Sequence, residues 1–342
     1  MIKINKDNSY FDEFSKELSI CLYKELKKAI EQKKVLKPSY KEDSTEEEKK
    51  KNTITLLGSD DIKCLKYLKD NIKKLISSNI DTQKIMIDFL KKECPSLTKK
   101  YNKNDSKSSI YKAIKYIFVD RGYEAKISSA KDGEIAYRLV KEIGVNTCPY
   151  CNRNYISAIT KDKKEESKTR PQLDHFYPKA IYPFLACSFY NLIPSCSACN
   201  LMKSDKDSFT DKLISPYEME TENFKFSYDL NNIDILNIGI NESAKYDYKD
   251  SINIIFDKKV EINEKYFELE KLYNQEHRDI VIELLVKKAY YPQSYIEELS
   301  TFGFSKDEIY RYLFSNYNQD DDLNKRPLSK LVRDISDELG LI

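Results

Sequence analysis

The sequence predicts a predominantly helical α+β protein, in which a small ββα metal-binding unit lies between helical flanking domains. Only 7 glycines and 10 prolines interrupt the 342 residues, which favours long helices. Two Cys-x-x-Cys pairs stand near mid-chain, among short aromatic runs and prolines that lack a helical repeat. We therefore expect a helical N-terminal domain at 1–147, the metal-binding unit at 148–212, and a mixed, then helical, region at 213–342 that packs on this unit.

The N-terminal region carries the clearest helical patterns. Between Tyr10 and Lys34, apolar residues recur at every third or fourth position, which places them on one face of a helix. Similar patterns lie around 62–77, 81–92 and 130–143. These four segments predict a helical domain.

The sequence pattern of the central unit differs from the helical repeat of the N-terminal region. Arg153 to Thr160 and Pro171 to Phe176 have the composition of short strands, separated by a charged turn, and predict a hairpin. Cys199 to Lys212 predicts a helix. The order of hairpin, loop and helix predicts the ββα arrangement.

The C-terminal region begins with two alternating segments, 224–228 and 251–256, which predict strands. An apolar stripe between Glu264 and Tyr290 predicts one long amphipathic helix, with His277 on that stripe. A histidine in this position is either a satisfied buried residue or a group that the helix directs at the central unit. The last ~50 residues are predicted to be helical.

Composition excludes several classes of protein. With 33% charged and 40% hydrophobic residues the chain is neither disordered nor membrane-spanning, and a net charge of +2 confines any nucleic-acid contact to local patches. No secretory signal is recognisable, so we expect a cytoplasmic protein without a membrane partner. In that compartment the unpaired cysteines are interpreted as buried core residues, not as a disulfide framework. They are Cys21, Cys64, Cys94 and Cys187.

Four further cysteines predict a metal site. They form the pairs Cys148–Cys151 and Cys196–Cys199, with 44 residues between the pairs. A Cys-x-x-Cys turn presents two thiolates, and two such turns complete the tetrahedron that structural zinc prefers. The competing hypothesis is a redox site at Cys148 and Cys151, which the second pair does not favour.

The segment between the two cysteine pairs contains residues suited to hydrolysis of a phosphodiester. His175 can accept a proton at neutral pH and so activate water. Asp174 and Asn200 offer oxygen ligands for Mg²⁺ or Mn²⁺, and Asn191 could orient the imidazole. These four residues are the predicted catalytic set.

Basic residues nearby are candidate phosphate contacts. Lys179 and Arg153 could bind phosphate as a point charge and as a planar fork, respectively. His277 or its neighbour Arg278 could reach the same phosphate if the C-terminal helix packs on the unit.

The chain resembles the HNH endonucleases of the ββα-metal superfamily. The resemblance rests on Leu173-Asp174-His175, Asn191-Leu192 and Lys203, together with the two cysteine pairs and the Asn200 that follows the second. It implies that Asp174 and Asn200 are ligands of the catalytic metal, that His175 is the general base, and that Asn191 orients it. It also adds Lys203 to the candidate phosphate contacts.

A longer string is similar to the HNH subunits of Septu-type anti-phage systems. It runs from Leu173 through Tyr182-Pro183 to Cys196, within a resemblance that covers about 148–290. This resemblance implies a defence effector whose partner is an ABC-type ATPase.

We therefore hypothesise a metal-dependent HNH endonuclease that cuts DNA, with structural Zn²⁺ and catalytic Mg²⁺ or Mn²⁺. The alternatives are a catalytically silent zinc-dependent module that binds nucleic acid or protein, and a thiol oxidoreductase.

Overall fold

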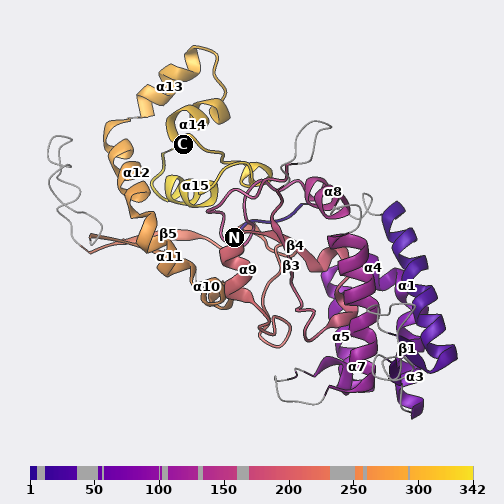
Figure 1. Cartoon of the computed structure of the whole chain (residues 1–342). Coiled ribbons are helices and arrows are strands. Elements are labelled where there is room, and N and C mark those ends of the chain that lie inside the picture. The colour runs from indigo at the N-terminus through magenta and orange to yellow at the C-terminus, as the bar shows by residue number, and fades with distance from the viewer. Residues whose placement is uncertain are drawn as a thin grey trace.

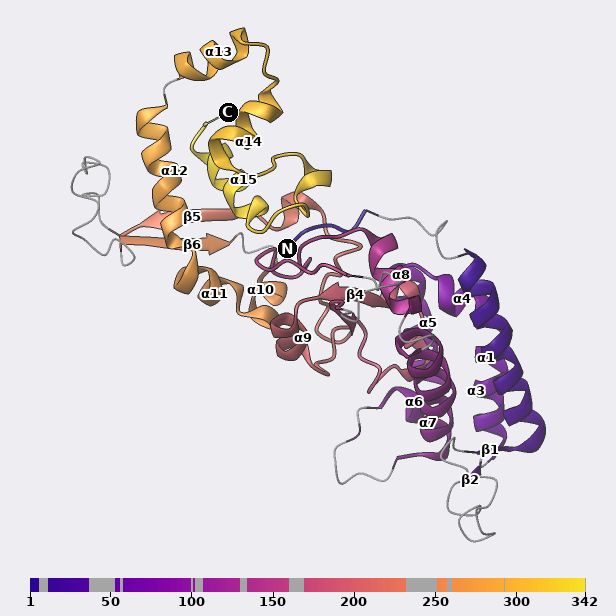
Figure 2. The same ribbon diagram turned by 45° about the horizontal axis from the view of Figure 1, so that its top comes forward.

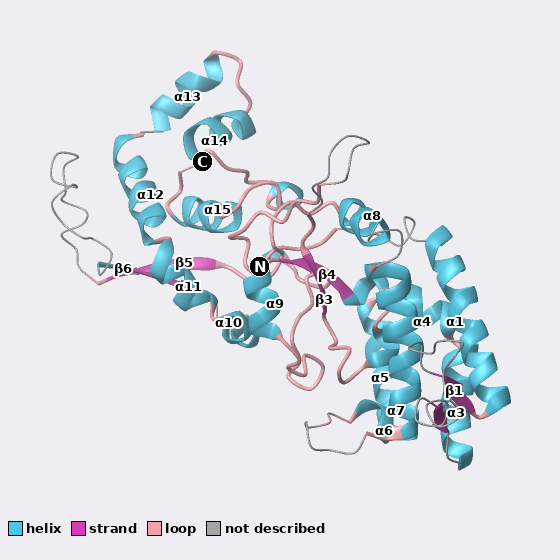
Figure 3. Cartoon of the chain, in the orientation of Figure 1, coloured by secondary structure: helices cyan, strands magenta, loops and turns pink. Residues whose placement is uncertain are grey.

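The computed structural model describes eleven stretches of the chain. The described residues are 1–5, 12–36, 53–55, 58–99, 101, 107–129, 134–159, 169–231, 251–256, 260–291 and 293–341. Over these residues the protein is predominantly helical, with three two-stranded antiparallel sheets (Figures 1 and 3). The predominantly helical α+β class is confirmed at this level.

The N-terminal helices form one flank of the molecule (Figure 1). All but one of the predicted helical segments appear close to their expected bounds, and the segment at 62–77 is divided in two at Asn71. The elements of this flank are α1 (Asp12–Gln32), β1 (Lys34–Leu36), β2 (Thr53–Thr55), α3 (Gly58–Asp70), α4 (Ile72–Ser77), α5 (Ile80–Glu93), α6 (Pro95–Thr98), α7 (Ser109–Ile114), the π-helix η2 (Lys115–Ser128) and α8 (Glu134–Ile143).

Residues 1–5 do not join these helices. The amide of Ile2 donates to the carbonyl of Pro149 at 2.9 Å, and the amide of Ile4 donates to that of Pro216 at 2.9 Å. The first residues therefore lie against the central unit, as the position of the N-terminus in Figure 2 shows.

The central unit has the order β3 (Gln172–His175), β4 (Leu192–Ser195) and α9 (Ser197–Lys203). Strand β3 pairs antiparallel with β4, so that Asp174 faces Ile193 and His175 faces Leu192. The loop between the strands contains two short 3₁₀ turns, η4 (Pro183–Leu185) and η5 (Phe189–Asn191), and most of it is buried. It is therefore part of the core and not an exposed connection.

The predicted hairpin of Arg153 to Thr160 with Pro171 to Phe176 is wrong. Its second half contains β3, but the partner of β3 is β4. Residues 153–159 make only isolated bridges, and Thr160 lies outside the described residues. All four residues of β4 are buried, and the sequence pattern had not singled out this segment as a strand. The predicted helix at Cys199–Lys212 is also too long, because α9 ends at Lys203 and the next residue, Ser204, has a φ of 48°.

The C-terminal region forms the other flank. Strands β5 (Phe226–Leu230) and β6 (Ile252–Phe256) confirm the two predicted strands, which pair antiparallel. The remaining elements are η6 (Thr221–Asn223), α10 (Glu261–Phe267), α11 (Leu269–Glu276), α12 (Arg278–Tyr290), α13 (Gln293–Thr301), α14 (Lys306–Phe314), η10 (Asp320–Asp322) and α15 (Ser329–Glu338).

The single helix predicted from Glu264 to Tyr290 is wrong, because three helices occupy this segment. Glu268 has a left-handed backbone with a φ of 46°, and His277 has a φ of −133°, so the chain bends at both positions. These bends let Tyr273 reach the central unit, where its hydroxyl donates to the carbonyl of Cys151 at 2.6 Å.

One disulfide corrects the interpretation of the single cysteines. Cys64 of α3 and Cys94 at the end of α5 are bonded, with 6.3 Å between their Cα atoms. The packing of these helices brings together two residues that are 30 positions apart, a proximity that no local pattern encodes. Because disulfides persist in oxidising surroundings, the cytoplasmic location stays a prediction. Among the described helices, none is both long and apolar enough to cross a bilayer.

Gly122 allows η2 to pack closely on the loop of the central unit. A Cβ atom at this position would lie 2.5 Å from Sγ of Cys187 and 3.2 Å from the carbonyl oxygen of Ile117. The thiol of Cys187 is itself held, since it is buried and donates to the carbonyl of Phe118 at 3.1 Å. A Cβ atom at position 122 could therefore be accommodated only if Cys187 lost its hydrogen bond to Phe118 or if the backbone moved.

We expect Gly122→Ala to lower the free energy of unfolding by about 1–3 kcal/mol through overpacking. Urea unfolding monitored by circular dichroism measures the change. The double variant Gly122→Ala/Cys187→Ala should recover part of the loss, because it removes the clashing sulfur. Equal stability of Gly122→Ala and the wild-type protein would contradict this account of the packing.

Candidate active site

The four paired cysteines form a single cluster. Their sulfur atoms lie within 4.8 Å of one another, and the Sγ atoms of Cys151 and Cys196 are 4.0 Å apart. Cys148, Cys151 and Cys199 are buried, and Cys196 is half-buried. Four thiolates bound to one zinc ion at about 2.3 Å require this degree of crowding. The cluster can therefore hold a metal ion such as zinc.

The turns that carry these cysteines have the local geometry that metal binding needs. After the first pair, Asn152 adopts a φ of 51°, and its amide donates to the carbonyl of Cys148 at 2.7 Å. The amide of Arg153 points at Sγ of Cys151, 3.4 Å away, where it can stabilise a thiolate. The second pair begins α9, and the amide of Asn200 donates to the carbonyl of Cys196 at 3.1 Å.

Asn152 ties the first cysteine turn to the C-terminal region. Its buried amide donates to Thr147 at 3.0 Å and to the carbonyl of Leu323 at 3.1 Å, and its oxygen accepts from the amide of Lys330 at 3.0 Å. The amide of Leu328 donates to the main-chain carbonyl of Asn152 at 2.6 Å. The turn is thus fixed by residues more than 170 positions away.

The redox alternative gains little from this geometry. A reactive Cys-x-x-Cys thiol needs exposure and a lowered pKa. Cys148 and Cys151 are both buried, so neither thiol is accessible to a substrate. Burial raises the pKa of the Cys148 thiol well above its usual value, whereas the hydrogen bond with Cys148 lowers the pKa of Cys151. The sulfur atoms of the second pair lie within 4.8 Å of those of the first, where a substrate disulfide would have to approach.

A pocket of 370 Å³ lies beside the cluster and brings together four residues predicted from the sequence. These are Asp174, His175, Lys179 and Asn200. The remaining residues that line it are Leu173, Pro178, Ala180, Leu201, Ser204 and Asp205. Strand β3, the segment after it and helix α9 therefore form the walls of one candidate active site.

Asp174 is held by two buried donors. The hydroxyl of Tyr150 donates to Oδ2 at 2.6 Å, and Nζ of Lys203 lies 3.2 Å from Oδ1 and 3.1 Å from Oδ2. Lys203 also donates to the carbonyl of His175 at 2.7 Å, so its three N–H groups have three acceptors. Only 4% of Asp174 is exposed, and a carboxylate so deeply buried needs this compensation.

His175 follows Asp174 as the last residue of β3, and both residues line the pocket. Its Nε2 atom lies 3.1 Å from the carbonyl oxygen of Ala186. A carbonyl only accepts, so in the neutral imidazole Nε2 carries the proton and Nδ1 is the atom with a free lone pair. The ring packs edge-on against Tyr123, with 4.4 Å between centroids.

The pKa of His175 is lowered to about 3. Burial is the main cause, and the positive charges of Lys179 and Lys203 add to it, while the hydrogen bond to Ala186 opposes it. The imidazole is therefore neutral at physiological pH, but a pKa so far below 7 also makes it a weaker base than an ordinary histidine.

Asn191 contacts the loop around His175 and not the imidazole. Its side chain accepts from the amide of Tyr177 at 2.7 Å and donates to the carbonyls of Tyr177 and Leu185, each at 3.1 Å. Leu185 immediately precedes Ala186, the residue whose carbonyl fixes the histidine. Asn191 thus braces the segment that supplies this carbonyl.

Asn200 lines the pocket from the first turn of α9. Its Nδ2 donates to Oε1 of Gln172 at 2.6 Å. This hydrogen bond engages the nitrogen end of the amide. The oxygen end is the one that would bind a cation.

The four candidate phosphate contacts have different surroundings. Lys179 lines the pocket, where it forms a 2.7 Å ion pair with Glu124. Lys203 is fully buried against Asp174. Nε of Arg153 donates to Nε2 of His277 at 2.9 Å, and neither of these two residues lines the pocket. The pKa of His277 is lowered, first by burial and then by the charge of Arg153.

Three contacts around the predicted set were not anticipated as parts of it. Tyr150 supports Asp174, Tyr123 packs on His175, and the main-chain carbonyl of Ala186 orients it. Only Tyr150 carried a sequence signal, since it lies inside the first cysteine pair. The other two come from η2 and from the loop between β3 and β4, whose approach depends on the tertiary fold.

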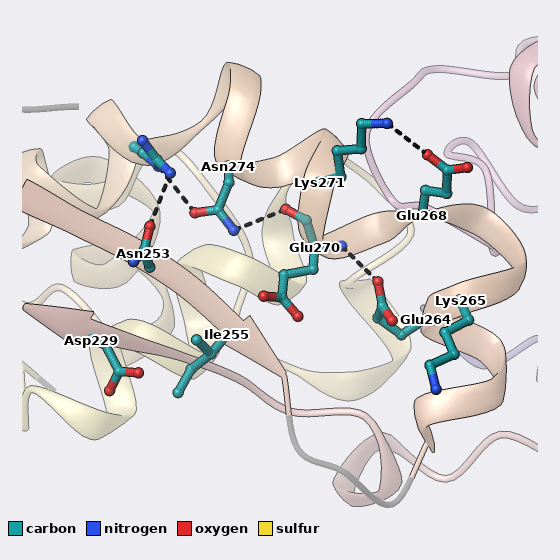
Figure 4. Close-up of a pocket in the computed structure, with 10 residues that line it drawn as sticks. Asp229, Asn253, Ile255, Glu264, Lys265, Glu268, Glu270, Lys271 and Asn274 are labelled. Carbon is teal, nitrogen blue, oxygen red and sulfur yellow. Dashed lines mark hydrogen bonds and ion pairs between the residues drawn. The ribbon is translucent and has the colours of Figure 1, made fainter. Parts of the chain in front are cut away.

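A larger, open pocket of 840 Å³ lies between the β5–β6 sheet and helices α10 to α12 (Figure 4). Its charged groups compensate one another: Lys271 pairs with Glu268 at 3.3 Å, and Arg278 donates to Asn274 and Asn253. Four carboxylates and three basic groups line it, which gives a net charge of −1. Such a surface does not attract phosphate, so we do not assign it a catalytic role.

Replacing Lys203 should destabilise the fold, because it leaves the buried Asp174 carboxylate without its cation. We expect Lys203→Met to lower the free energy of unfolding by about 3–5 kcal/mol in urea titrations at pH 7. Lys206→Met is the matched control, since Lys206 is exposed and lies three residues further along the chain. Equal effects of the two substitutions would contradict the importance of the buried pair.

The lowered pKa of His175 predicts a pH-dependent stability. Above about pH 6.5 the imidazole is neutral in both the folded and the unfolded chain, and below it only the unfolded chain takes up the proton until the pH approaches 3. Between pH 7 and pH 5, the wild-type protein should lose about 2 kcal/mol more stability than His175→Gln. Urea unfolding at both pH values tests this, and parallel losses would contradict the assigned pKa.

Comparison with known proteins finds a partial relative. The chain is similar to the Septu protein PtuB of Bacillus thuringiensis, with 37% identity over 75 residues, which are 22% of this chain and 26% of that protein. The similarity thus spans about a quarter of the relative's length. No protein-family model and no solved structure matches the chain. The similarity agrees with the resemblance to Septu-type proteins seen in the sequence.

Proposed function

We propose that the protein is a metal-dependent HNH endonuclease that hydrolyses DNA as an effector of prokaryotic anti-phage defence. The observation that carries this proposal is the single pocket lined by Asp174, His175 and Asn200 beside a cluster of four cysteines. Two oxygen ligands and a neutral imidazole, held next to a thiolate-rich structural site, are the groups that such hydrolysis needs.

The roles of the residues follow from their contacts. His175 would accept a proton from water at Nδ1, because its Nε2–H group donates a hydrogen bond to the carbonyl of Ala186. Asp174 and Asn200 would hold Mg²⁺ or Mn²⁺, which when bound neutralises charge on the phosphate and on the leaving oxygen. The four cysteines would hold structural Zn²⁺ and keep α9 against β3.

The position of Lys203 assigns it a different role from the phosphate contact suggested by the sequence. Its ammonium is buried and has three acceptors in Asp174 and His175. Lys179 remains the basic residue that lines the pocket. We therefore assign the phosphate contact to Lys179 and the support of Asp174 to Lys203.

The similarity to a Septu protein supports the defence role, and the resemblance implies an ABC-type ATPase as the partner. A chain with a net charge of +2 has no strong general attraction for DNA. A partner that supplies or controls DNA contact would compensate for this.

A second candidate function is a catalytically silent zinc-dependent binding module. One observation favours it: both oxygens of Asp174 are already engaged by buried donors, and only 7% of His175 is exposed. In this case the protein would bind DNA or a partner without cutting.

Plasmid nicking with Mg²⁺ or Mn²⁺ tests the nuclease proposal. We expect His175→Ala to cut at least about 100-fold more slowly than the wild-type protein, because it lacks the general base. His277→Ala is the matched control, since it removes a histidine that pairs with Arg153 outside the pocket. The nicks should carry 5′-phosphate and 3′-hydroxyl ends, so DNA ligase should be able to seal them.

Undiminished cutting by His175→Ala would show that the catalytic assignment is wrong. DNA binding by the wild-type protein without cleavage under Mg²⁺, Mn²⁺ or other divalent ions would instead support the silent binding module.

A further inference from the structure

Tyr150 connects the two predicted metal sites. It lies between Cys148 and Cys151 and is completely buried, and its hydroxyl donates to Oδ2 of Asp174 at 2.6 Å. One end of this residue is therefore part of the structural cysteine turn, while the other touches a proposed ligand of the catalytic metal. No other residue of the first cysteine turn bonds to Asp174 among the described contacts.

The ring of Tyr150 has little freedom to point elsewhere. It stacks on Phe267 of α10 with 4.4 Å between centroids and 23° between the ring planes. The main chain on both sides is fixed, since Pro149 accepts from the amide of Ile2 and Cys151 accepts from the hydroxyl of Tyr273. A rigid ring on a rigid turn gives its hydroxyl a defined position.

The carboxylate of Asp174 is correspondingly restrained from two sides. Tyr150 approaches from the cysteine turn, and Lys203 approaches from α9, which begins at the second cysteine pair. Both groups depend on the four-cysteine cluster for their place, because the cluster joins the first turn to α9. The orientation of Asp174 is thus linked to the integrity of this cluster.

We propose that Tyr150 is a positioning residue that couples the cysteine cluster to Asp174 and thereby sets the affinity of the catalytic site for a divalent cation. This inference rests on the proposed function, because it takes Asp174 as a metal ligand. The hydroxyl fixes the carboxylate in one orientation before a cation arrives, so less ordering is needed on binding. Loss of the hydroxyl leaves the carboxylate held by Lys203 alone.

Tyr150→Phe isolates this role, because it keeps the stacked ring and removes only the hydroxyl. Tyr182→Phe is the matched control: Tyr182 is also fully buried and donates to a carboxylate, that of Asp207, at 2.7 Å, and neither residue lines the pocket. Titration of the zinc-loaded, full-length protein with Mn²⁺, followed by electron paramagnetic resonance, measures cation affinity without requiring cleavage. Zinc content, thermal midpoint and the Mn²⁺ dependence of plasmid nicking complete the comparison.

For Tyr150→Phe we expect Mn²⁺ affinity to fall by about 10-fold, at the lower end of the loss typical when a residue that supports a metal ligand is removed. The Mn²⁺ concentration needed for half-maximal nicking should rise by a similar factor. Zinc content should equal that of the wild-type protein, and the thermal midpoint should fall no further than that of Tyr182→Phe, which also loses a hydrogen bond to a carboxylate. Tyr182→Phe should match the wild-type protein in Mn²⁺ affinity and nicking.

Three results would overturn the inference. If the wild-type protein binds Mn²⁺ and nicks DNA but Tyr150→Phe does both equally well, the coupling is wrong while the proposed function stands. If Tyr150→Phe loses zinc or melts at a lower temperature than Tyr182→Phe, the tyrosine serves the fold and not the ligand. If the wild-type protein neither binds Mn²⁺ nor nicks DNA, the proposed function fails and this inference fails with it.

Discussion

The convergence of four cysteines from two distant turns is the constraint on which the site depends. The cluster joins residues 148–151 to 196–199 and so closes a 44-residue segment that contains both strands of the central unit. Because α9 starts at the second turn, this closure also fixes Asn200 and Lys203 relative to β3. The elements around it are themselves braced, by Asn152 toward the C-terminal region and by Tyr273 toward α11.

The second important interaction is the buried pair of Asp174 and Lys203. Burial of a carboxylate is costly unless a cation and hydrogen bonds compensate for it, and here the ammonium and the Tyr150 hydroxyl provide both. A divalent cation bound by Asp174 would compete with Lys203 for the same two oxygens. The pair therefore holds the Asp174 carboxylate in a defined orientation, and a cation that bound there as proposed would first have to displace Lys203.

Much of this site could be read from the sequence, because its chemistry lies in short motifs. The cysteine spacing predicted the cluster, and Asp174, His175 and Asn200 were expected to act together. The partner of β3 could not be predicted, since the loop before β4 has the composition of a buried core segment. The contacts of Tyr123 and Ala186 with His175, and the Cys64–Cys94 disulfide, depend on packing between elements far apart in the chain.

The electrostatics of the pocket bear on how a nucleic acid could reach it. Of the two lysines near the catalytic set, Lys203 is committed to Asp174, and Lys179 is paired with Glu124 from η2. A phosphate that approached Lys179 would have to draw it away from Glu124, and Asp205 adds a further negative charge to the pocket wall. If the pocket acts on a nucleic-acid backbone as proposed, other contacts would have to deliver that backbone, which agrees with a chain that carries a net charge of only +2. Recognition and catalysis would then reside on different surfaces, and control of the first would suffice to control the second.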